Sequence, residues 1–436
     1  MAPLSLTDRT SALPGFTPGA VPVALARQLI LDSIVTVTDQ QSVLLNQALG
    51  RILTENLLCP IDVPAHDNSA MDGYALSADN LPVTGVARFA VRGTRLAGPL
   101  AVTPPEASTP IELLECVRIM TGAMMPPGCD TVVPQELVAL QDDQTIIVRA
   151  GTVHRGENRR LRGEDLQQHS VALARGRCLR PSDLGLLASL GINRVKVFRP
   201  VRVAFFSTGD ELRSLGEPLP PGCVFDANRY TLLGMLQRLG CELVDLGLVA
   251  DTAAALQDAF IRASEQADLV ITSGGVSVGD ADLTKKVMVT LGDIQFWTIA
   301  MRPGRPLAFG HIHSADGGAG IPVFGLPGNP VAVMVTFYFL VRDALIHLQG
   351  GRPEPLPMLQ VRCAHAIRKR PSRTEYQRAS VQQDAKGQTL VAVTGAQGSG
   401  ILSSMSAANA IIVLEHERGD VAAGEWVSVI LMDGLI

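Results

Sequence analysis

Aromatic residues are scarce in this chain of 436 residues, where Phe, Trp and Tyr together make up 4%. Charged residues are also few, at 18%, and the formal net charge is −5. The chain therefore lacks the basic stripe of a nucleic-acid-binding protein, and we expect no nucleic-acid partner. The hydrophobic share of 47% is that of an ordinary globular protein, and the length is sufficient for two to four domains, each with its own core.

Paired metal-binding or disulfide motifs are absent as well. The seven cysteines are scattered, odd in number and contain no C-x-x-C pair, which favours reduced thiols in a cytosolic protein. His311 and His313 form a lone H-x-H that we interpret as solvated surface, so no zinc site is expected. The first twenty residues hold no apolar core of signal-peptide length. No run approaches the ~20 apolar residues of a membrane span, and we expect a cytoplasmic protein without a membrane partner.

The usual nucleotide-binding signatures are missing too. The sequence contains neither G-x-x-x-x-G-K-[ST] nor G-x-G-x-x-G, which argues against an ATPase and against a dehydrogenase.

A glycine-rich turn is the most informative segment that is present. Residues 268–272 predict a buried parallel strand, and residues 273–282 predict a turn that leads into a helix over 282–291. Three glycines let the backbone bend and let a ligand approach its N–H groups: Gly274, Gly275 and Gly279. Asp280 and Asp282 stand where they can cap the helix or ligate Mg²⁺. A capped turn that binds nothing is the alternative interpretation.

Two further turns follow the same plan. Residues 207–212 (STGDEL) come after a predicted strand, and residues 325–330 (GLPGNP) come between a predicted strand and a predicted helix. In an open parallel sheet ligands bind beyond the carboxyl ends of the strands, so three such turns are expected to face one cleft.

The order of predicted elements indicates four domains. We expect a helical linker domain (20–50 plus 166–197), a β-rich domain (51–165), a central α/β domain with a doubly wound, mostly parallel sheet (198–350), and a small antiparallel β-barrel-like domain (351–436). In the linker domain, helices are predicted over 23–34, 38–49 and 181–190. In the α/β domain the predicted strands are 201–206, 242–248, 268–272, 294–300 and 321–324, and the predicted helices are 228–239, 252–265, 282–291 and 331–348.

Three more polar motifs lie in the β-rich part, namely DNSAMDGYA (67–75), RIMTGA (118–123) and RRLRGED (159–165). Taken singly, the first two are typical of hydrogen-bonded turns and the third of a solvated charge run.

Together with STGDEL, SGGVSVGDAD (273–282), MRPGRP (301–306) and GLPGNP, these motifs resemble, in order and over nearly the whole length, the bacterial molybdopterin molybdenumtransferases, a family that includes the E domain of gephyrin. The resemblance implies an elongated, L-shaped homodimer whose active site lies between the α/β domain of one subunit and the β-rich domain of the other. It implies an enzyme that takes adenylylated molybdopterin and molybdate, inserts molybdenum into the dithiolene and releases AMP with the help of Mg²⁺.

The resemblance also implies roles for individual residues. Matching catalytic positions are Asp67, Thr121, Glu211, Asp251 and Asp282, and the metal contacts would be Asp280 and Asp282. Matching substrate-binding positions are Arg160, Asp165, Ser273, Gly274, Gly275, Arg302, Arg305, Pro306, Pro327, Pro330, Arg378 and Ser399. The sequence departs from the family at Thr298, where a lysine or arginine is common, and at Ala332, where a serine is usual.

Arginines suit the oxyanion substrate for a physical reason. Molybdate is a tetrahedral dianion, and the forked N–H groups of arginine match such oxyanions. Arg302 and Arg305 stand on a loop stiffened by prolines, although the family commonly carries lysines there.

Two other functions stay open on the sequence. One is a scaffold of the gephyrin type without catalysis. The other is a different molybdopterin or nucleotide enzyme, such as an adenylyltransferase or a competence-damage-type hydrolase, which would resemble residues 200–350 alone. Candidate partners are a molybdopterin adenylyltransferase and acceptor molybdoenzymes, and the sequence does not distinguish molybdate from tungstate.

Overall fold

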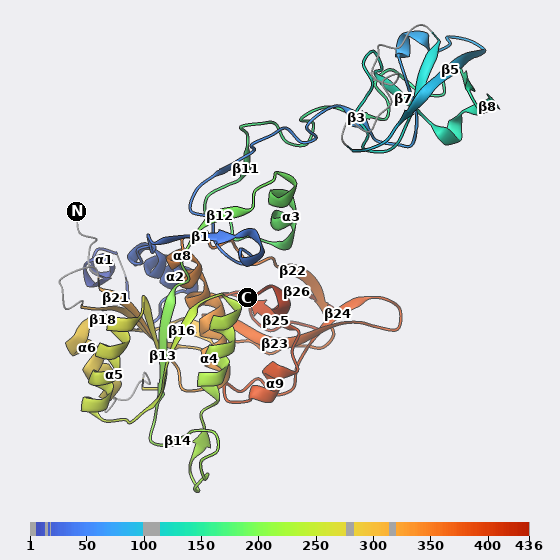
Figure 1. The fold of residues 1–436 in the computed structure, drawn as a ribbon. Coiled ribbons are helices and arrows are strands. Elements are labelled where there is room, and N and C mark those ends of the chain that lie inside the picture. The colour runs from blue at the N-terminus through green and yellow to red at the C-terminus, as the bar shows by residue number, and fades with distance from the viewer. Residues whose placement is uncertain are drawn as a thin grey trace. The chain divides into compact units, whose positions relative to one another are not determined.

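The computed structural model describes residues 6–13, 16–17, 19–98, 114–275, 283–313 and 320–435 (Figure 1). The chain divides into two compact units. The larger unit comprises Met1–Thr54, Gly176–Pro181 and Arg194–Ile436, and the smaller unit comprises Glu55–Arg175 and Ser182–Asn193.

A six-stranded sheet forms the centre of the larger unit. Its strand order is β16-β13-β17-β21-β20-β18, in which the first four strands are parallel and β20 runs antiparallel to both of its neighbours. The strands are β13 (Arg202–Thr208), β16 (Glu242–Val249), β17 (Leu269–Ser273), β18 (Gly292–Thr298), β20 (Pro306–Ile312) and β21 (Ile321–Leu326). The predicted mostly parallel sheet is confirmed, and β20 is a strand that the sequence analysis did not predict.

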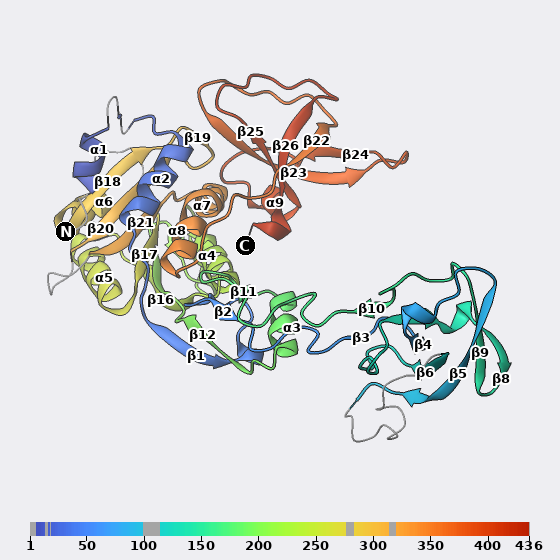
Figure 2. The same ribbon diagram turned by 90° about the horizontal axis from the view of Figure 1, so that it is seen from above.

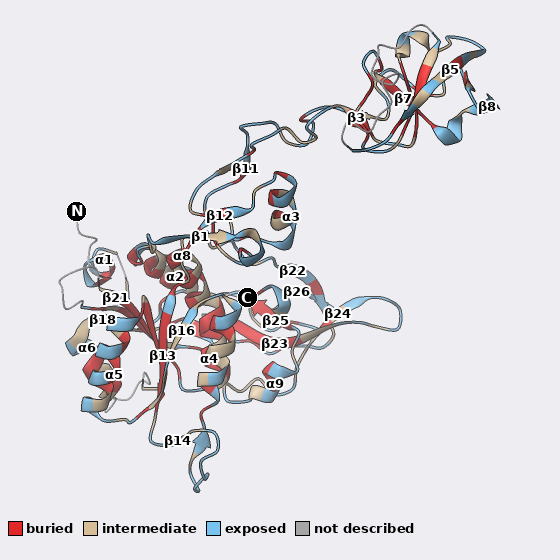
Figure 3. Cartoon of the chain, in the orientation of Figure 1, coloured by how far each residue is buried: buried red, intermediate tan, exposed pale blue. Residues whose placement is uncertain are grey.

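Helices cover both faces of this sheet, as Figures 1 and 3 show. Side chains of β13 alternate between the two cores. Val203 and Phe205 lie in the core that contains α2 (Val23–Ser33) and α4 (Ala227–Arg238). Ala204 and Phe206 lie in the core that contains α5 (Ala253–Gln266) and α6 (Leu283–Leu291). A strand buried on both faces reads as a continuous apolar run, which is why β13 was predictable.

The longest helical segment belongs to the first of these cores. It consists of α7 (Pro330–Thr336), a π-helical stretch (Phe337–Val341) and α8 (Arg342–Leu348). Among the described residues it is the one helix long and apolar enough to cross a membrane, but 72% of the relevant window is buried inside the unit. Packing against the sheet therefore accounts for its apolar character.

Two elements near the N-terminus were not predicted from the sequence, a strand in place of a predicted helix and an additional short helix. The predicted helix over 38–49 is wrong, because Gln40–Leu44 forms strand β1, which pairs antiparallel with β12 (Arg194–Phe198). A partner some 150 residues away along the sequence decides this local structure. The short helix α1 (Leu6–Ser11) is held to β18, where the Asp293 carboxylate accepts from the Leu6 amide at 2.7 Å.

The C-terminal part of the larger unit is a closed five-stranded barrel (Figure 2). Neighbours follow in the order β23-β24-β22-β26-β25, and β25 pairs back onto β23. The strands are β22 (Leu359–Cys363), β23 (Thr374–Gln383), β24 (Thr389–Val393), β25 (Ala410–Leu414) and β26 (Trp426–Leu431), with a short helix α9 (Leu402–Ser406). The barrel-like domain is confirmed. The expectation that it is antiparallel is wrong for one pair, since β22 and β24 run parallel.

The smaller unit is β-rich, as predicted. Its sheet has the order β7-β4-β6-β5-β9-β8 and encloses a core around Tyr74, Phe89 and Ile146. The strands are β4 (Gly73–Leu76), β5 (Val86–Arg95), β6 (Glu115–Ile119), β7 (Thr131–Pro134), β8 (Ala139–Asp142) and β9 (Thr145–Arg149). The unit also contains two short strand pairs, β3 (Asn68–Ser69) with β10 (Arg159–Arg160) and β2 (Leu57–Leu58) with β11 (Val171–Leu173). Helix α3 (Pro181–Ser189) belongs to it except for its first residue.

Candidate functional site

Three of the predicted turns meet at one edge of the central sheet. β13, β17 and β21 are adjacent and parallel, with Ser207 opposite Ser273 and Ser273 opposite Leu326. After β13 the chain passes to β16 on one side, and β17 lies on the other side. Ligands of open α/β sheets bind at such a point of reversal, beyond the carboxyl ends of the strands.

The first two glycines of the glycine-rich turn are required by close packing. Gly274 and Gly275 have φ values of +95° and +65°. A Cβ at Gly274 would lie 2.4 Å from the backbone oxygen of Thr208, and a Cβ at Gly275 would lie 2.0 Å from Oγ1 of Thr284. No other residue fits there without moving the end of β13 or the first turn of α6.

Ser273, the last residue of β17, is nearly fully buried. Its Oγ accepts a hydrogen bond of 2.8 Å from Nδ2 of Asn228, and the same nitrogen donates to the carbonyl oxygen of Gly328 at 2.7 Å. Asn228 lies in the first turn of α4, whose N-cap is Asp226. The sequence analysis did not select Asn228, although an aspartate followed by an asparagine at the start of a predicted helix was a visible signal.

Carboxylates crowd the same edge. Asp251 follows β16, and burial raises its pKa above the ordinary 3.8, with a further increase caused by the nearby Asp210 and Glu211. Its Oδ1 is buried and has no hydrogen-bond partner among the described residues. The predicted Glu211 and Asp251 are thus brought together. Asp280 and Asp282 lie outside the described residues, and within the described ranges no group of His, Cys, Asp or Glu has the geometry of a metal site.

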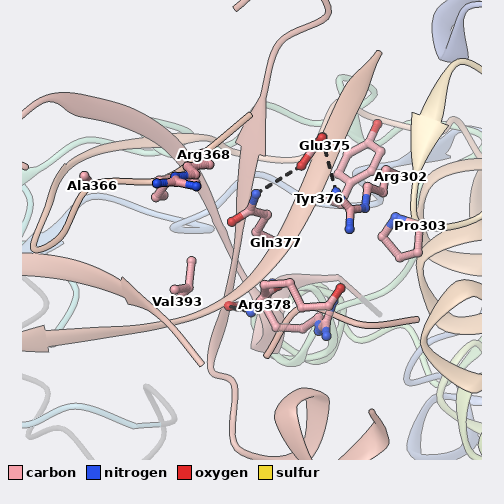
Figure 4. Close-up of a pocket in the computed structure, with 11 residues that line it drawn as sticks. Arg302, Pro303, Ala366, Arg368, Glu375, Tyr376, Gln377, Arg378 and Val393 are labelled. Atoms are coloured by element: carbon pink, nitrogen blue, oxygen red, sulfur yellow. Dashed lines mark hydrogen bonds and ion pairs between the residues drawn. The ribbon is translucent and has the colours of Figure 1, made fainter. Parts of the chain in front are cut away.

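Two of the predicted residues, Arg302 and Arg378, line a cavity between the loop 301–306 and the barrel. The two-residue strand β19 (Met301–Arg302) pairs in parallel with the start of β23, which places Arg302 opposite Glu375. The cavity has a volume of about 230 Å³. Its lining consists of Arg302, Pro303, Ala366, Ile367, Arg368, Glu375, Tyr376, Gln377, Arg378, Val393 and Gln397 (Figure 4).

Glu375 is a buried carboxylate in this lining that the sequence analysis missed. Its Oε1 lies 2.8 Å from Nη2 of Arg373. The same oxygen lies 3.9 Å from Nη1 of Arg302, and Oε2 accepts from Gln377 at 3.1 Å (Figure 4). The long side chain of Arg302 is half exposed, and its ion pair with Glu375 holds it at the cavity.

Arg378 is buried and holds the loop that precedes Ser399. Its guanidinium donates to the carbonyl oxygens of Ala396 and Gly398 and to Oγ of Ser404 at 2.9–3.1 Å. No described carboxylate lies within ion-pair distance, and its pKa is lowered, first by burial and then by Arg302. Its charge is therefore not neutralised by any described carboxylate.

The cavity is not lined by the remaining predicted residues of the larger unit, which are Arg305, Pro306, Pro327, Pro330 and Ser399. The carbonyl oxygen of Ser399 accepts from the Val331 amide at 3.0 Å, which joins the barrel loop to the turn formed by Pro327 and Pro330. Pro330 is the first residue of α7. Arg305 is exposed, and Pro306 begins β20 opposite Thr298.

The smaller unit brings its three motifs together. Oδ1 of Asp67 accepts from the Arg162 amide at 2.8 Å, and β3 pairs with β10. Both the amide and the hydroxyl of Thr121 donate to Oδ1 of Asp72 at 2.7 Å, and these bonds lower the pKa of Asp72 below 3.8. The side chains of Arg160 and Asp165 are exposed. Asp72, which fixes Thr121, was not among the predicted site residues.

Comparisons with known proteins agree with these motifs. Residues 21–191 match the MoeA N-terminal region (domain I and II), residues 204–347 a probable molybdopterin binding domain, and residues 360–432 the MoeA C-terminal region (domain IV). A molybdopterin molybdenumtransferase of Haemophilus influenzae is 42% identical over 405 residues, which cover 93% of this chain and 96% of that protein. The chain belongs to the molybdopterin molybdenumtransferase family.

Two other comparisons agree with this family. Gephyrin of Dictyostelium discoideum is 30% identical over 94% of this chain, but the match covers 62% of gephyrin. The crystal structure of the molybdopterin biosynthesis MoeA protein of Pyrococcus horikoshii OT3 superimposes with a TM-score of 0.77 at 27% identity and covers 94% of this chain and 100% of that one. The predicted fold and family are thereby confirmed.

Proposed function

We propose that this transferase inserts molybdenum from molybdate into adenylylated molybdopterin and releases AMP. The observation that carries the proposal is the 42% identity to a molybdopterin molybdenumtransferase over 93% of the chain. The site geometry in the larger unit is consistent with it, since one edge offers hydroxyl and backbone donors and a separate cavity offers arginines.

The strand edge suits the phosphate of the nucleotide-tagged pterin. Turns after β17 and β21 are tied together by Asn228, and Gly274 and Gly275 let the turn after β17 pack closely against Thr208 and Thr284, which fixes its backbone. Preorganised donors of this kind stabilise the charge that develops on phosphoryl oxygens when the bond to AMP breaks. Ser273, Gly274 and Gly275 are the residues we assign to this contact, with Pro327 and Pro330 shaping the adjacent turn.

The residues at this edge fit a divalent cation. Asp251 has a buried oxygen without a described partner and a raised pKa, both signs of negative charge that is not neutralised by the protein. We assign Asp280 and Asp282, supported by Glu211 and Asp251, to Mg²⁺, a hard cation that prefers oxygen ligands. When bound, the ion would neutralise charge on the phosphoryl oxygens.

Molybdate is assigned to the arginine-lined cavity and its neighbouring loops. Arg302, Arg305 and Arg378 supply positive charge, and Ser399 and Pro306 border the same segments. Forked N–H donors match a tetrahedral oxyanion. Thr298 and Ala332 leave one cation and one hydroxyl of the usual set unprovided, which we expect to weaken anion binding by about 1–3 kcal/mol per missing contact.

The smaller unit supplies the rest of the proposed site. Asp67, Thr121, Arg160 and Asp165 are assigned to the face that a homodimer would present to the strand edge of the other subunit. We further propose that the protein acts in the cytoplasm, receives its substrate from a molybdopterin adenylyltransferase and delivers its product to molybdoenzymes.

The alternatives explain less of the chain. An adenylyltransferase or nucleotide hydrolase accounts for the central α/β region but leaves the matches over 21–191 and 360–432 without a role. A scaffold without catalysis does not require the packed glycine turn or the unneutralised carboxylates.

The test is AMP release from adenylylated molybdopterin, measured with and without molybdate. We expect molybdate-dependent release by the unchanged protein and a severe loss in Asp282→Ala and Arg302→Ala. Arg262→Ala is the matched control, because Arg262 has a similar exposure and, among the described residues, forms an ion pair only with Asp258 on the surface of α5. No AMP release by the unchanged protein contradicts the proposed function. Equal rates in all variants contradict the site assignment, and light scattering tests the dimer.

A further inference from the structure

The geometry around Asn228 fixes the direction of one hydroxyl proton. Nδ2 of Asn228 lies 2.7 Å from the carbonyl oxygen of Gly328, which can only accept. The atom at that position must therefore be the amide nitrogen, not the amide oxygen. Its second hydrogen goes to Oγ of Ser273, 2.8 Å away, so both amide hydrogens are used and Ser273 is the acceptor.

An accepting Ser273 keeps its own proton for another partner. A serine hydroxyl has one hydrogen to donate, and no described residue accepts it. The side chain is nearly fully buried at the carboxyl end of β17, where an unused donor is costly unless a ligand oxygen receives it. Had Asn228 been an acceptor, Ser273 would have donated to it and offered a ligand only lone pairs.

From these contacts we infer that Asn228 is a positioning residue for the substrate's phosphate. It orients the Ser273 hydroxyl as a donor towards a phosphate oxygen, and its bond to the carbonyl oxygen of Gly328 fixes its own orientation. This inference rests on the proposed function and deepens it. Asn228 itself need not touch the substrate.

A double-mutant cycle tests the inference. Initial rates of AMP release are measured against the concentration of adenylylated molybdopterin, at saturating molybdate, for Asn228→Ala, Ser273→Ala and the double variant. Loss of a hydrogen bond to a charged group raises KM about tenfold, so we expect that increase for each single variant, with a smaller change in kcat. Since Asn228 acts through Ser273, the double variant should be no worse than Ser273→Ala alone.

If the increases in KM of the two single variants multiply in the double variant, Asn228 acts through the fold alone, and the inference is overturned. An unchanged KM in Asn228→Ala would overturn it as well. If Asn228→Ala does not fold at the assay temperature, Asn228→Ser enters the same cycle. Asn409→Ala is the matched control, because Asn409 also bonds through its amide, to the backbone of Val381 in the barrel, and should leave KM unchanged.

Asn228→Asp tests the donor direction at constant volume. A carboxylate cannot donate to Gly328 and would accept the Ser273 proton, so KM should rise at least as far as in Asn228→Ala. A wild-type KM in this variant contradicts the inference. If the unchanged protein releases no AMP, the proposed function is contradicted. If it is active but the effects of Asn228→Ala and Ser273→Ala are independent, only the inference about Asn228 is contradicted.

Discussion

The strand edge and the barrel cavity of the larger unit are opposite in charge and in construction. At the strand edge, carboxylates of Asp210, Glu211 and Asp251 repel one another, and the backbone is packed without space for a side chain. At the cavity, Arg302 and Arg378 face the same hollow, and Arg302 retains a half-exposed side chain. The first region therefore carries fixed negative charge on a tightly packed backbone, and the second carries arginines around an open hollow.

The packed glycine turn should give the largest effect on this contrast. Gly274→Ala places a Cβ against the Thr208 carbonyl at a positive φ and should destabilise the fold by about 3 kcal/mol or more. Gly222→Ala is the control, because Gly222 also has a positive φ but nothing within 4 Å, and should cost about 1 kcal/mol. Urea unfolding measures both. Equal losses would mean that the close approach to β13 is unimportant.

Removing the cavity arginine comes next. Arg302→Ala should raise KM for molybdate by roughly tenfold to a hundredfold, because a charge-assisted contact contributes about 1.5–3 kcal/mol. KM for adenylylated molybdopterin should change less, since that substrate is assigned to the strand edge. Molybdate-dependent AMP release measures both constants, and a loss confined to the pterin substrate would reverse the assignment of the two regions.

Neutralising Glu375, the carboxylate that pairs with Arg302, should also raise KM for molybdate, but by less. Glu375→Gln keeps the shape and the contact with Gln377 but removes the charge that attracts Arg302 and Arg373. We expect KM for molybdate to rise by a few-fold, less than in Arg302→Ala, with kcat nearly unchanged. A greater loss than in Arg302→Ala would show that Glu375 has a role other than positioning that arginine.

Replacing Asp251 should have the smallest effect, a change in thermal stability whose direction follows from its raised pKa. Its folded pKa is raised, so protonation favours the folded state, and the penalty of the charged carboxylate is absent at low pH and develops as the pH rises through the folded pKa. Asp251→Asn should therefore melt slightly higher than the unchanged protein at pH 7, with the difference vanishing towards pH 3. Added Mg²⁺ should raise the melting temperature of the unchanged protein more than that of the variant. Thermal scans across pH, with and without Mg²⁺, check both expectations.

The sequence predicted the central strands and the barrel because their signals are local. Runs such as residues 203–206 (VAFF) are apolar on both faces, which identifies a buried strand without knowledge of its neighbours. β20 was missed because Pro306 and Gly310 read as breaks. In the structure Gly310 is required by the approach of β18, since a Cβ there would lie 2.1 Å from the oxygen of Asp293.

In the candidate site, too, local motifs were recognisable and long-range partners were not. Motifs located Ser273, Glu211 and Arg302, but the residues that hold them were not predictable from spacing. Asn228 reaches Ser273 across 45 residues, and Asp72 reaches Thr121 across 49. Such partners are set by which strands become neighbours, and that information appears only after the chain has folded.

The two residues of β19 have a consequence for how this molecule can be recombined. Met301 and Arg302 are encoded with the α/β domain, yet they pair in register with Thr374 and Glu375 of the barrel, and the Thr374 amide donates to the carbonyl oxygen of Ala300 at 2.9 Å. Exchanging the barrel for that of a distant relative would therefore change the surroundings of a proposed molybdate ligand without altering its own domain. Grafted chimaeras need residues 301–306 and 373–378 to be transferred together.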